Sequence, residues 1–312
     1  MSEATVVSEI VQAKKYGIAI IANDRVIDWL LPFLESYKAT SASIPLYLIP
    51  YDDNLTRTRK AADAYDVEVV SLDSGELDAL ARRLYPLNPG HRRRLRKLLA
   101  LALPLDEVIY LDVDTIMLQN FNKVLGYIEP GKTEFIVSSR CHDYIYNSRH
   151  KNYDFLRDAL MFNDGFFVTS RHVLSLQDFY DVIAKDERTF HIVRQRGGLF
   201  AQPLTNFVVH RQNLKIAMLP EIIPTASEES YYKAEGIAQG AGGPRRLQGR
   251  AAVLLPLAGH HRNAAPAQGG RPIMASIRRQ GRSPLQRLAT TLAGASAAFF
   301  KSGSTSSASR CR

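Results

Sequence analysis

The stretch that decides the fold is Val108-Ile-Tyr-Leu-Asp-Val-Asp-Thr-Ile-Met-Leu118. It is an apolar run of the kind found in buried strands, and it contains two carboxylates, Asp112 and Asp114. Side chains two residues apart project to the same face of an extended chain. Both carboxylates can therefore approach one cation. Hard oxygen ligands of this kind suit Mg²⁺ or Mn²⁺, which commonly keep open positions for substrate phosphates.

A second interpretation of this pair stays open. The two residues can be loop carboxylates that are satisfied by backbone N–H groups. Burying two acids near each other is costly, however, unless a cation or hydrogen-bond donors compensate. The apolar residues on both sides of Asp112 and Asp114 favour the metal-binding interpretation.

Short apolar runs recur around this stretch, with helical patterns between several of them. The predicted strands are 17–22, 45–49, 67–72, 107–111, 134–138 and 165–170, and the predicted helices are 26–37, 56–65 and 92–103. Strands that alternate with helices predict an α/β fold, in which a mostly parallel sheet is covered by helices on both faces. Ligands of such sheets bind at the carboxyl ends of the strands.

The composition changes near Ala234. The net charge of the chain is +9, but residues 234–312 hold eleven Arg and one Lys against one acid, which leaves residues 1–233 near neutral. The segment 234–312 also holds only two of the 28 aromatic residues. It is therefore predicted to be a basic tail, rich in Ala, Gly and Arg, that cannot build a comparable core and is disordered or out of frame.

Features that would direct the chain to a membrane or out of the cell are not found in the sequence. Glu3 and Glu9 precede any apolar run, and no run of about twenty apolar residues exists. The two cysteines, Cys141 and Cys311, are too far apart in sequence to suggest a disulfide framework. The expected location is the cytoplasm.

The segment VIYLDVDTIMLQN, residues 108–120, resembles the Asp-x-Asp segment of nucleotide-sugar-dependent glycosyltransferases of the GT-A fold, particularly the family 8-like retaining enzymes. The resemblance runs from about Gly17 to Pro220. It implies a Rossmann-like nucleotide-diphospho-sugar transferase fold, an Mg²⁺ or Mn²⁺ cofactor held by Asp112 and Asp114, and a UDP-sugar as the favoured donor. The acceptor would be an unknown glycan, lipid or protein, and no specific nucleic acid is expected as a partner.

The resemblance also implies which residues bind the nucleotide of the donor. In such enzymes the first strand and its turn hold the nucleotide, and a basic residue on the helix before the Asp-x-Asp strand assists the diphosphate. The implied donor-nucleotide residues are Ala22, Asn23, Asp24, Arg94, Lys97 and Asp112. Alternatively, the basic run 91–97 is a solvated helix face, from which one or two cations point inward.

Two further segments bear on the donor sugar. Phe162-Asn-Asp-Gly-Phe166 is similar to a family segment that contacts this sugar, and residues 201–206, AQPLTN, are similar to a DQ-x-x-LN segment. The Asp and the Leu of the family segment are replaced there by Ala201 and Thr205. The resemblance implies catalytic roles, as groups that bind sugar hydroxyls and stabilise an oxocarbenium-like transition state, for Asn163, Asp164 and Gln202. Alternatively, the 163–165 segment is simply a turn, and Gln202 satisfies loop backbone.

A third metal ligand, a histidine in a His-x-x-Gly-type segment, is not found where the resemblance implies it. Codons for residues 256–260, read one nucleotide later, can encode such a segment. We therefore hypothesise a frameshifted C-terminal quarter that impairs activity, with a native basic tail as the alternative. Two other functions stay open: a phosphatase of the haloacid-dehalogenase type, whose Asp-x-Asp also follows an apolar strand, and a non-catalytic protein of the same fold with a nucleic-acid-binding tail.

Overall fold

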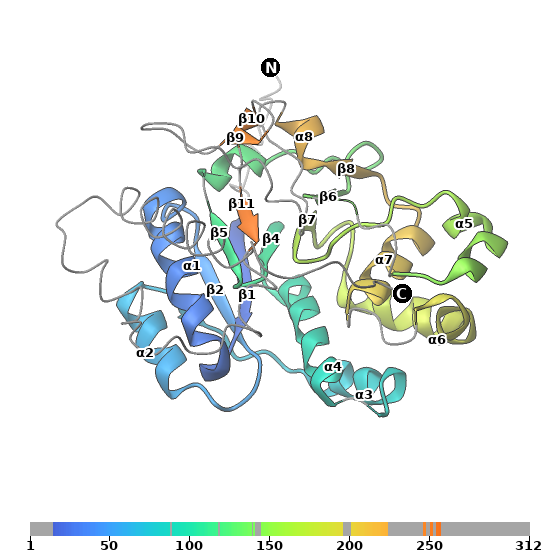
Figure 1. Ribbon diagram of the computed structural model, residues 1–312, viewed down its shortest axis with the longest axis horizontal. Helices are drawn as coiled ribbons and strands as arrows, with labels where there is room; N and C mark the ends of the chain where they lie inside the picture. Colours follow the sequence, from blue (N-terminus) through green and yellow to red (C-terminus); the bar gives the residue numbers. More distant parts are fainter. Residues whose placement is uncertain are drawn as a thin grey trace, which may run out of the picture.

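The computed structural model describes residues 15–87, 89–117, 119–138, 140, 145–195 and 201–223, together with the backbone of three short strands between residues 246 and 256. The described part forms one seven-stranded sheet with helices on either side (Figure 1). The order of the strands is β3-β2-β1-β4-β7-β6-β8. Their bounds are β1 Tyr16–Ala22, β2 Leu46–Pro50, β3 Glu68–Val69, β4 Glu107–Leu111, β6 Phe135–Val137, β7 Phe166–Ser170 and β8 Ile216–Met218.

The pairing of the strands is mostly parallel. The neighbours β1 and β2, β2 and β3, β1 and β4, and β6 and β8 are parallel. Only β7 runs the other way, antiparallel to both β4 and β6. The predicted fold class, an α/β fold with a mostly parallel sheet, is therefore confirmed. The reversed β7 matters for function, because it begins at the edge where β4 ends.

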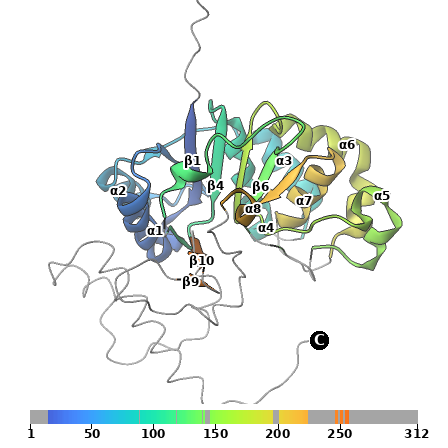
Figure 2. The same ribbon diagram turned by 90° about the horizontal axis from the view of Figure 1, so that it is seen from above.

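Helices lie on both faces of the sheet, with α1 and α2 on one side and α3, α6 and α7 on the other (Figure 2). The α-helices are α1 Ile27–Thr40, α2 Thr56–Ala64, α3 Gly75–Leu84, α4 Pro89–Arg94, α5 Asp154–Arg157, α6 Leu176–Val193, α7 Gln202–Arg211 and α8 Leu219–Ile222. The 3₁₀-helices are η1 Asp24–Val26, η2 Leu95–Ala102, η3 Phe121–Val124 and η4 Ser148–Asn152.

Alternation along the central strands divides the core into two apolar layers. On β4, Ile109 and Leu111 pack into the layer under α1, whereas Val108 and Tyr110 pack into the layer under η2, α6 and α7. This is the period of two that a strand imposes on its side chains. Because both faces are covered, every residue of β4 is buried, and its sequence reads as a continuous apolar run.

The predicted elements are present in the structure, with two changes and several additions. Strand β8 and helices α3, α5, α6, α7 and α8 were not predicted, β3 is limited to Glu68–Val69, and the basic segment 92–103 begins in α4 and continues as the 3₁₀-helix η2. In η2, residues three apart lie on one face, because a 3₁₀-helix has three residues per turn. Leu95, Leu98 and Leu101 share the face that packs into the core.

Most of the predicted tail lies outside the described residues, as does the predicted boundary between 233 and 234. Three short strands of the tail are placed: β9 Arg246–Leu247, β10 Arg250–Ala251 and β11 Leu254–Pro256. Strand β11 pairs antiparallel with β5, Thr115–Met117, which directly follows the Asp-x-Asp residues. Within the described ranges, no helix is long and apolar enough to cross a membrane.

A buried serine fixes β5 against α1. The hydroxyl of Ser36 donates to the carbonyl of Phe33 at 2.7 Å and accepts the backbone N–H of Met117 at 3.1 Å. Ser36 and Met117 are both fully buried. The position of β5, which follows Asp114, therefore depends on the hydrogen bond between the backbone of Met117 and the side chain of Ser36.

Replacing this serine tests that dependence. Ser36→Ala leaves the N–H of Met117 buried without a partner, and we expect the free energy of unfolding to fall by about 1 to 3 kcal/mol. The exposed Ser71, in the loop before α3, is the matched control, and Ser71→Ala should change this free energy by less than about 0.5 kcal/mol. Urea unfolding measures both variants. Equal stability of the two would show that Ser36 does not fix β5.

Candidate functional site

The candidate site lies where β4 ends and β7 begins. The two strands are antiparallel, with Leu111 opposite Phe166, so the residue after β4 lies beside the turn before β7. The backbone N–H of Asp112 donates to the carbonyl of Gly165 at 2.8 Å. A Cβ atom at Gly165 would lie 3.0 Å from Oδ2 of Asp112. Glycine at this position therefore leaves room for the carboxylate.

A buried lysine joins the two sides of this edge. Lys97 is 5% exposed, and its Nζ lies 3.1 Å from Oδ1 of Asp164 and 3.3 Å from Oδ1 of Asp112. The same ammonium group donates to the backbone carbonyl of Asp164 at 3.2 Å and lies over the ring of Tyr110, 5.0 Å from its centroid. The structure thus brings together three residues that the sequence predicted as site residues from separate segments.

The carboxylates of this cluster have further donors. The hydroxyl of Tyr110 donates to Oδ1 of Asp112 at 2.6 Å, and the hydroxyl of Thr205 donates to Oδ2 of Asp164 at 2.9 Å. Asp164 is only 3% exposed, whereas the side chain of Asp112 is 38% exposed. Asp164 is therefore an internal anchor, and Asp112 is the member of the cluster that faces solvent.

Charge stabilises the lysine in its protonated form. Burial alone would lower the pKa of Lys97, but Asp112 and Asp164 raise it above its usual value. Burial raises the pKa of Asp164, with Lys97 and Thr205 acting in the opposite direction. A buried charge is tolerated only when it is paired, and Lys97 meets this condition through two carboxylates.

The 3₁₀ geometry of η2 explains why one cation of the basic run points inward. Arg94 and Lys97 are three residues apart and lie on one side, and the charge of Arg94 lowers the pKa of Asp114. Arg93 and Arg96 lie on another side, where they pair with Asp52 and Asp78. Lys97 is buried, so it is one of the one or two cations of this run that were expected to point inward.

Asp114 is the second carboxylate of the pair. Burial and the neighbouring charge of Asp112 raise the pKa of Asp114 to about 7, with Lys97 and Arg94 opposing the increase. The charge of Asp112 disfavours the ionised form of Asp114, and a divalent cation beside both carboxylates would offset this effect. Among the described residues, no group of three or more His, Cys, Asp and Glu side chains is arranged to hold a metal. A cation held by Asp112 and Asp114 therefore stays a prediction.

The predicted nucleotide segment lies at the end of β1, next to β4. The side chain of Asn23 donates to Oδ2 of Asp52 at 2.9 Å, and the carbonyl of Ala22 accepts the N–H of Tyr51 at 2.9 Å. The carboxylate of Asp24 accepts the N–H groups of Arg57 and Thr58 at the start of α2, at 3.1 and 2.8 Å. These polar groups shape the edge of the sheet, and their contact with a nucleotide stays a prediction.

The predicted sugar-binding residues also make contacts within the protein, and their contact with a sugar stays a prediction. Oδ1 of Asn163 accepts the N–H of Gly165 at 2.8 Å, which closes the turn before β7. Gln202 is buried at the first turn of α7. Asn206, also buried on α7, donates to the carbonyls of Phe162 and Gln202 and accepts the N–H of Phe162. Asn206 therefore fastens the 162–165 turn to α7.

Sequence reasoning missed three contributors to the site. Tyr110 has a hydroxyl within an otherwise apolar strand, two residues before Asp112, and this position on the same strand side was an available signal. Asp52 lies in a turn after β2 and pairs with Arg93. Thr205 was noted only as a departure from the family pattern, yet it donates to Asp164. The partners of Asp52 and Thr205 come from distant segments, so their roles could not be read from local spacing.

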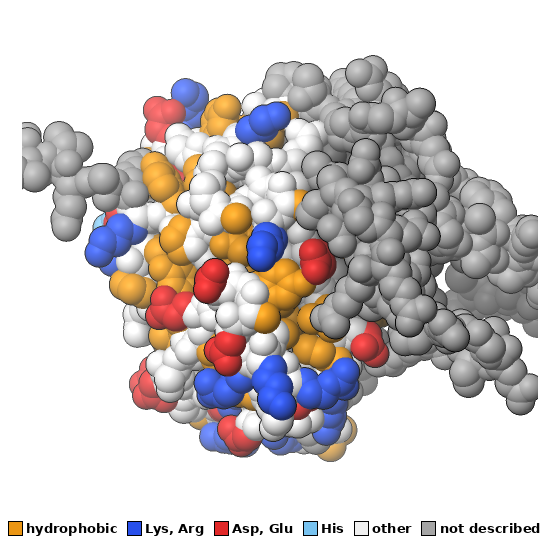
Figure 3. All heavy atoms as spheres, turned by 90° about the vertical axis from the view of Figure 1, so that its left-hand side faces the viewer, with side chains coloured by type: hydrophobic (Ala, Val, Ile, Leu, Met, Phe, Trp, Pro, Cys, Tyr) orange, Lys and Arg blue, Asp and Glu red, His pale blue; other side chains and the backbone are white. Residues whose placement is uncertain are grey.

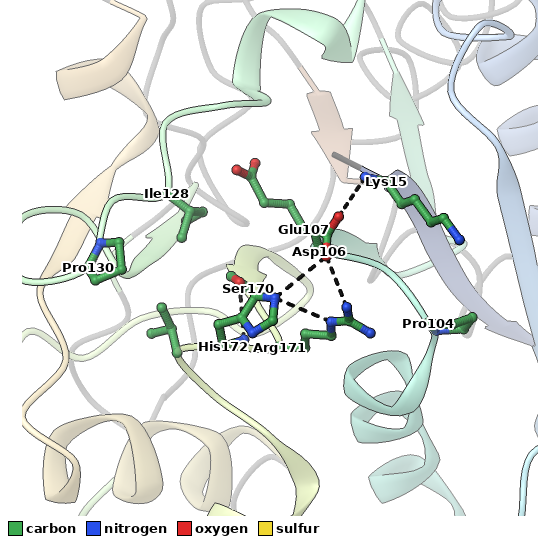
Figure 4. A pocket seen from close by; sticks show the side chains of 10 residues that line it. Lys15, Pro104, Asp106, Glu107, Ile128, Pro130, Ser170, Arg171 and His172 are labelled. Carbon is green, nitrogen blue, oxygen red and sulfur yellow. Dashed lines mark hydrogen bonds and ion pairs between the residues drawn. The ribbon is translucent and has the colours of Figure 1, made fainter. Parts of the chain in front are cut away.

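A cavity of about 470 Å³ lies at the opposite edge of the sheet, at the amino ends of β1 and β4 (Figure 4). Asp106 points into the group of side chains there, where it accepts the N–H of Lys15 at 2.8 Å and pairs with Arg171 at 3.1 Å. His172 lies 3.5 Å from the same carboxylate. Asp106 and Arg171 are therefore paired with each other in this cavity.

Comparison with known proteins gives similarity of structure only. No protein-family model matches the sequence, and no curated protein sequence matches it. The fold is similar to that of mouse xyloside xylosyltransferase 1, with a TM-score of 0.48 and 14% identity over 66% of this chain and 85% of that one. It is also similar to the bifunctional glycosyltransferase WbbM, with a TM-score of 0.47 and 12% identity over 68% of this chain and 40% of that one.

A third solved structure, the glycosyltransferase GlyE of Streptococcus pneumoniae, matches with a TM-score of 0.40 and 13% identity over 66% of this chain and 45% of that one. The chain spans less than half the length of WbbM and GlyE. All three solved structures are glycosyltransferases, the class that the 108–120 segment resembles. The case for a function of this chain rests on the chemistry of its own site.

The buried lysine is the part of the site whose removal should be most costly. Lys97→Met leaves Asp112 and Asp164 without their cation, and we expect the free energy of unfolding to fall by about 3 to 5 kcal/mol. Adding Asp164→Asn should restore part of this loss, because the uncompensated buried charge disappears. The exposed Lys185 on α6 is the matched control. Urea unfolding that finds Lys97→Met no more costly than Lys185→Met would contradict the ion-pair account.

Proposed function

We propose that the chain is a glycosyltransferase that moves a sugar from a nucleotide-diphosphate donor to an acceptor. The observation that supports this function is the carboxylate pair Asp112 and Asp114 at the carboxyl end of a buried strand, beside the buried Lys97–Asp164 ion pair. This edge of a parallel sheet is where nucleotide ligands of α/β folds bind. A UDP-sugar is the donor that the sequence resemblance favours.

Asp112 and Asp114 would hold Mg²⁺ or Mn²⁺ in this proposal. A bound divalent cation neutralises the charge that develops on a leaving nucleoside diphosphate. The raised pKa of Asp114 supports this role, because a cation would offset the repulsion between the two carboxylates. Arg94 adds a positive charge near Asp114, so it would help to bind the diphosphate.

The other residues of the cluster would position these ligands. Lys97 and the hydroxyl of Tyr110 both contact Oδ1 of Asp112, which leaves Oδ2 as the oxygen for a cation. Asp164 and Asn206 hold the 162–165 turn in place from the other side. Asn163 lies on this turn and is partly exposed, so it is the residue of the segment that would reach a donor sugar.

The stereochemistry is an expectation from the sequence resemblance, which implies retention of the anomeric configuration. The phosphatase alternative needs the first aspartate of its motif as a nucleophile on the first strand of the fold. Here Asp112 follows β4, and its Oδ1 accepts a hydrogen bond from Tyr110 at 2.6 Å and pairs with Lys97. These contacts favour a fixed metal ligand over an attacking carboxylate.

The first test removes the proposed metal ligands one at a time. Asp112→Asn or Asp114→Asn should weaken Mn²⁺-dependent UDP binding and slow transfer roughly a hundredfold or more, because an amide is a poorer ligand for a hard cation. Calorimetry of UDP with Mn²⁺ measures the binding. Asp63→Asn, on the exposed side of α2, is the matched control and should bind UDP as the unmodified protein does.

Stability separates loss of binding from loss of structure. The pKa of Asp114 is raised from 3.8 to about 7 in the folded state, so its ionisation costs stability that is lost as the pH rises through this range and is fully lost above pH 7. Asp114→Asn removes this charge and should be at least as stable as the unmodified protein at pH 8. UDP affinity that is equal in the unmodified protein and both site variants would rule out the metal assignment.

A second test addresses the donor sugar. Asn163→Ala should slow transfer by about tenfold or more, the cost of losing a hydrogen bond to a sugar hydroxyl in the transition state, and should leave UDP binding nearly unchanged. Transfer rates with a UDP-sugar and calorimetry with bare UDP measure the two effects. Loss of UDP binding in parallel with turnover would assign Asn163 to the turn or to the nucleotide instead.

A further inference from the structure

A second cavity, of about 410 Å³, lies between the turn that follows β2 and the helices α3, α4 and η2. Its lining includes five arginines, one aspartate and one tyrosine. The arginines are Arg25, Arg82, Arg92, Arg93 and Arg96. Seen from the side of α1 and α2, the left-hand side of Figure 1, Lys and Arg side chains gather at the lower end of the molecule (Figure 3). We call this cavity the arginine pocket.

Three of the five arginines are held in place by protein groups. Arg96 pairs with Asp78 through two nitrogens, at 2.6 and 3.2 Å, and Arg93 pairs with Asp52 at 3.2 Å. Arg92 donates to backbone carbonyls of residues 85 and 86. Asp78 is the only carboxylate among the described lining residues, and with Asp52 beside Arg93 it leaves the five arginines with a net positive charge.

The other two arginines differ from these three. Arg25, which follows the end of β1, and Arg82, on α3, are both exposed, and neither guanidinium has a hydrogen bond or ion pair within the described part of the chain. They line the same cavity, so their like charges repel each other and those of the fixed arginines. Such an arrangement lowers its energy when an anion enters. A guanidinium matches phosphate oxygens in geometry and can bind them through two N–H groups.

The position of the pocket separates it from the carboxylate pair. Its residue Tyr51 directly follows β2, whereas Asp112 and Asp114 follow β4, and β1 lies between these strands. Two strand spacings correspond to about 10 Å. In the proposed function, the donor diphosphate binds at the carboxylate pair. The pocket adjoins the predicted nucleotide residues, since Arg25 follows Asp24 and Asp52 contacts both Arg93 and Asn23. A nucleoside diphosphate has no phosphate beyond the two that the carboxylate pair would bind, so a phosphate in the arginine pocket would belong to another molecule.

We propose that the arginine pocket binds a phosphate group of the acceptor, which makes the acceptor a phosphorylated molecule. Arg25 and Arg82 supply the unpaired guanidiniums, and Arg93 and Arg96, fixed by Asp52 and Asp78, form the wall of the pocket. The assignment of this phosphate to the acceptor rests on the proposed function, whereas the phosphate site itself does not. The proposal gives the class of acceptor, an anionic molecule, which the sequence left open.

The test uses glucose 6-phosphate as the probe and glucose as its neutral counterpart, at low salt and without metal. Calorimetry should find binding of glucose 6-phosphate, and no binding of glucose at the same concentrations. The double variant Arg25→Gln/Arg82→Gln should weaken binding about tenfold or more, the scale of losing a charged hydrogen bond. The matched control Arg149→Gln/Arg188→Gln removes two exposed arginines elsewhere and should bind as the unmodified protein does.

A competition arm separates the acceptor from the donor. Saturating UDP with Mg²⁺ should leave the affinity for glucose 6-phosphate within about twofold of its value without UDP. Complete displacement by UDP would overturn the proposal, because the pocket would then belong to the donor. Absence of glucose 6-phosphate binding, or equal binding by the two double variants, would overturn it as well. Failure of UDP to bind while the probe still binds would count against the proposed function and leave the phosphate site standing.

Discussion

One buried ammonium group determines the arrangement of the candidate site. Lys97 lies within 3.3 Å of carboxylate oxygens on both Asp112 and Asp164, which come from the end of β4 and the start of β7. Without it, the buried carboxylate of Asp164 would lie near Asp112 with no cation to balance it, at a large cost in free energy. Three features of the fold bring these charges together. Strand β7 runs antiparallel to β4, the 3₁₀-helix η2 turns Lys97 inward, and Thr205 on α7 donates to Asp164.

The basic residues around Lys97 fall into two neighbouring groups, one beside the carboxylate pair and one in the arginine pocket. Inward-facing Lys97 and nearby Arg94 accompany the carboxylate pair, while Arg93 and Arg96 turn away toward Asp52 and Asp78. A single basic segment thus contributes to both the proposed donor site and the arginine pocket. The close spacing of the two regions along the carboxyl edge would let one enzyme bring a donor and an anionic acceptor together.

Much of the fold could be predicted from the sequence, because strands buried on both faces, such as 108–111, show as unbroken apolar runs. The pairing of Asp112 with the 163–165 turn could be predicted only through family resemblance. Local patterns could not reveal that β7 is antiparallel, since a buried strand has the same composition in either direction. Nor could they reveal Asp52 or Thr205, whose roles depend on partners brought near by the fold.

The central claim is that this edge of the sheet binds a nucleoside diphosphate through a divalent cation. The most direct measurement is calorimetric titration of the unmodified protein with UDP, first with Mn²⁺ and then with excess chelator. The account predicts clear binding with Mn²⁺ and a loss of at least tenfold in affinity when the cation is removed. Binding of the same strength in both titrations, or no binding in either, would contradict it.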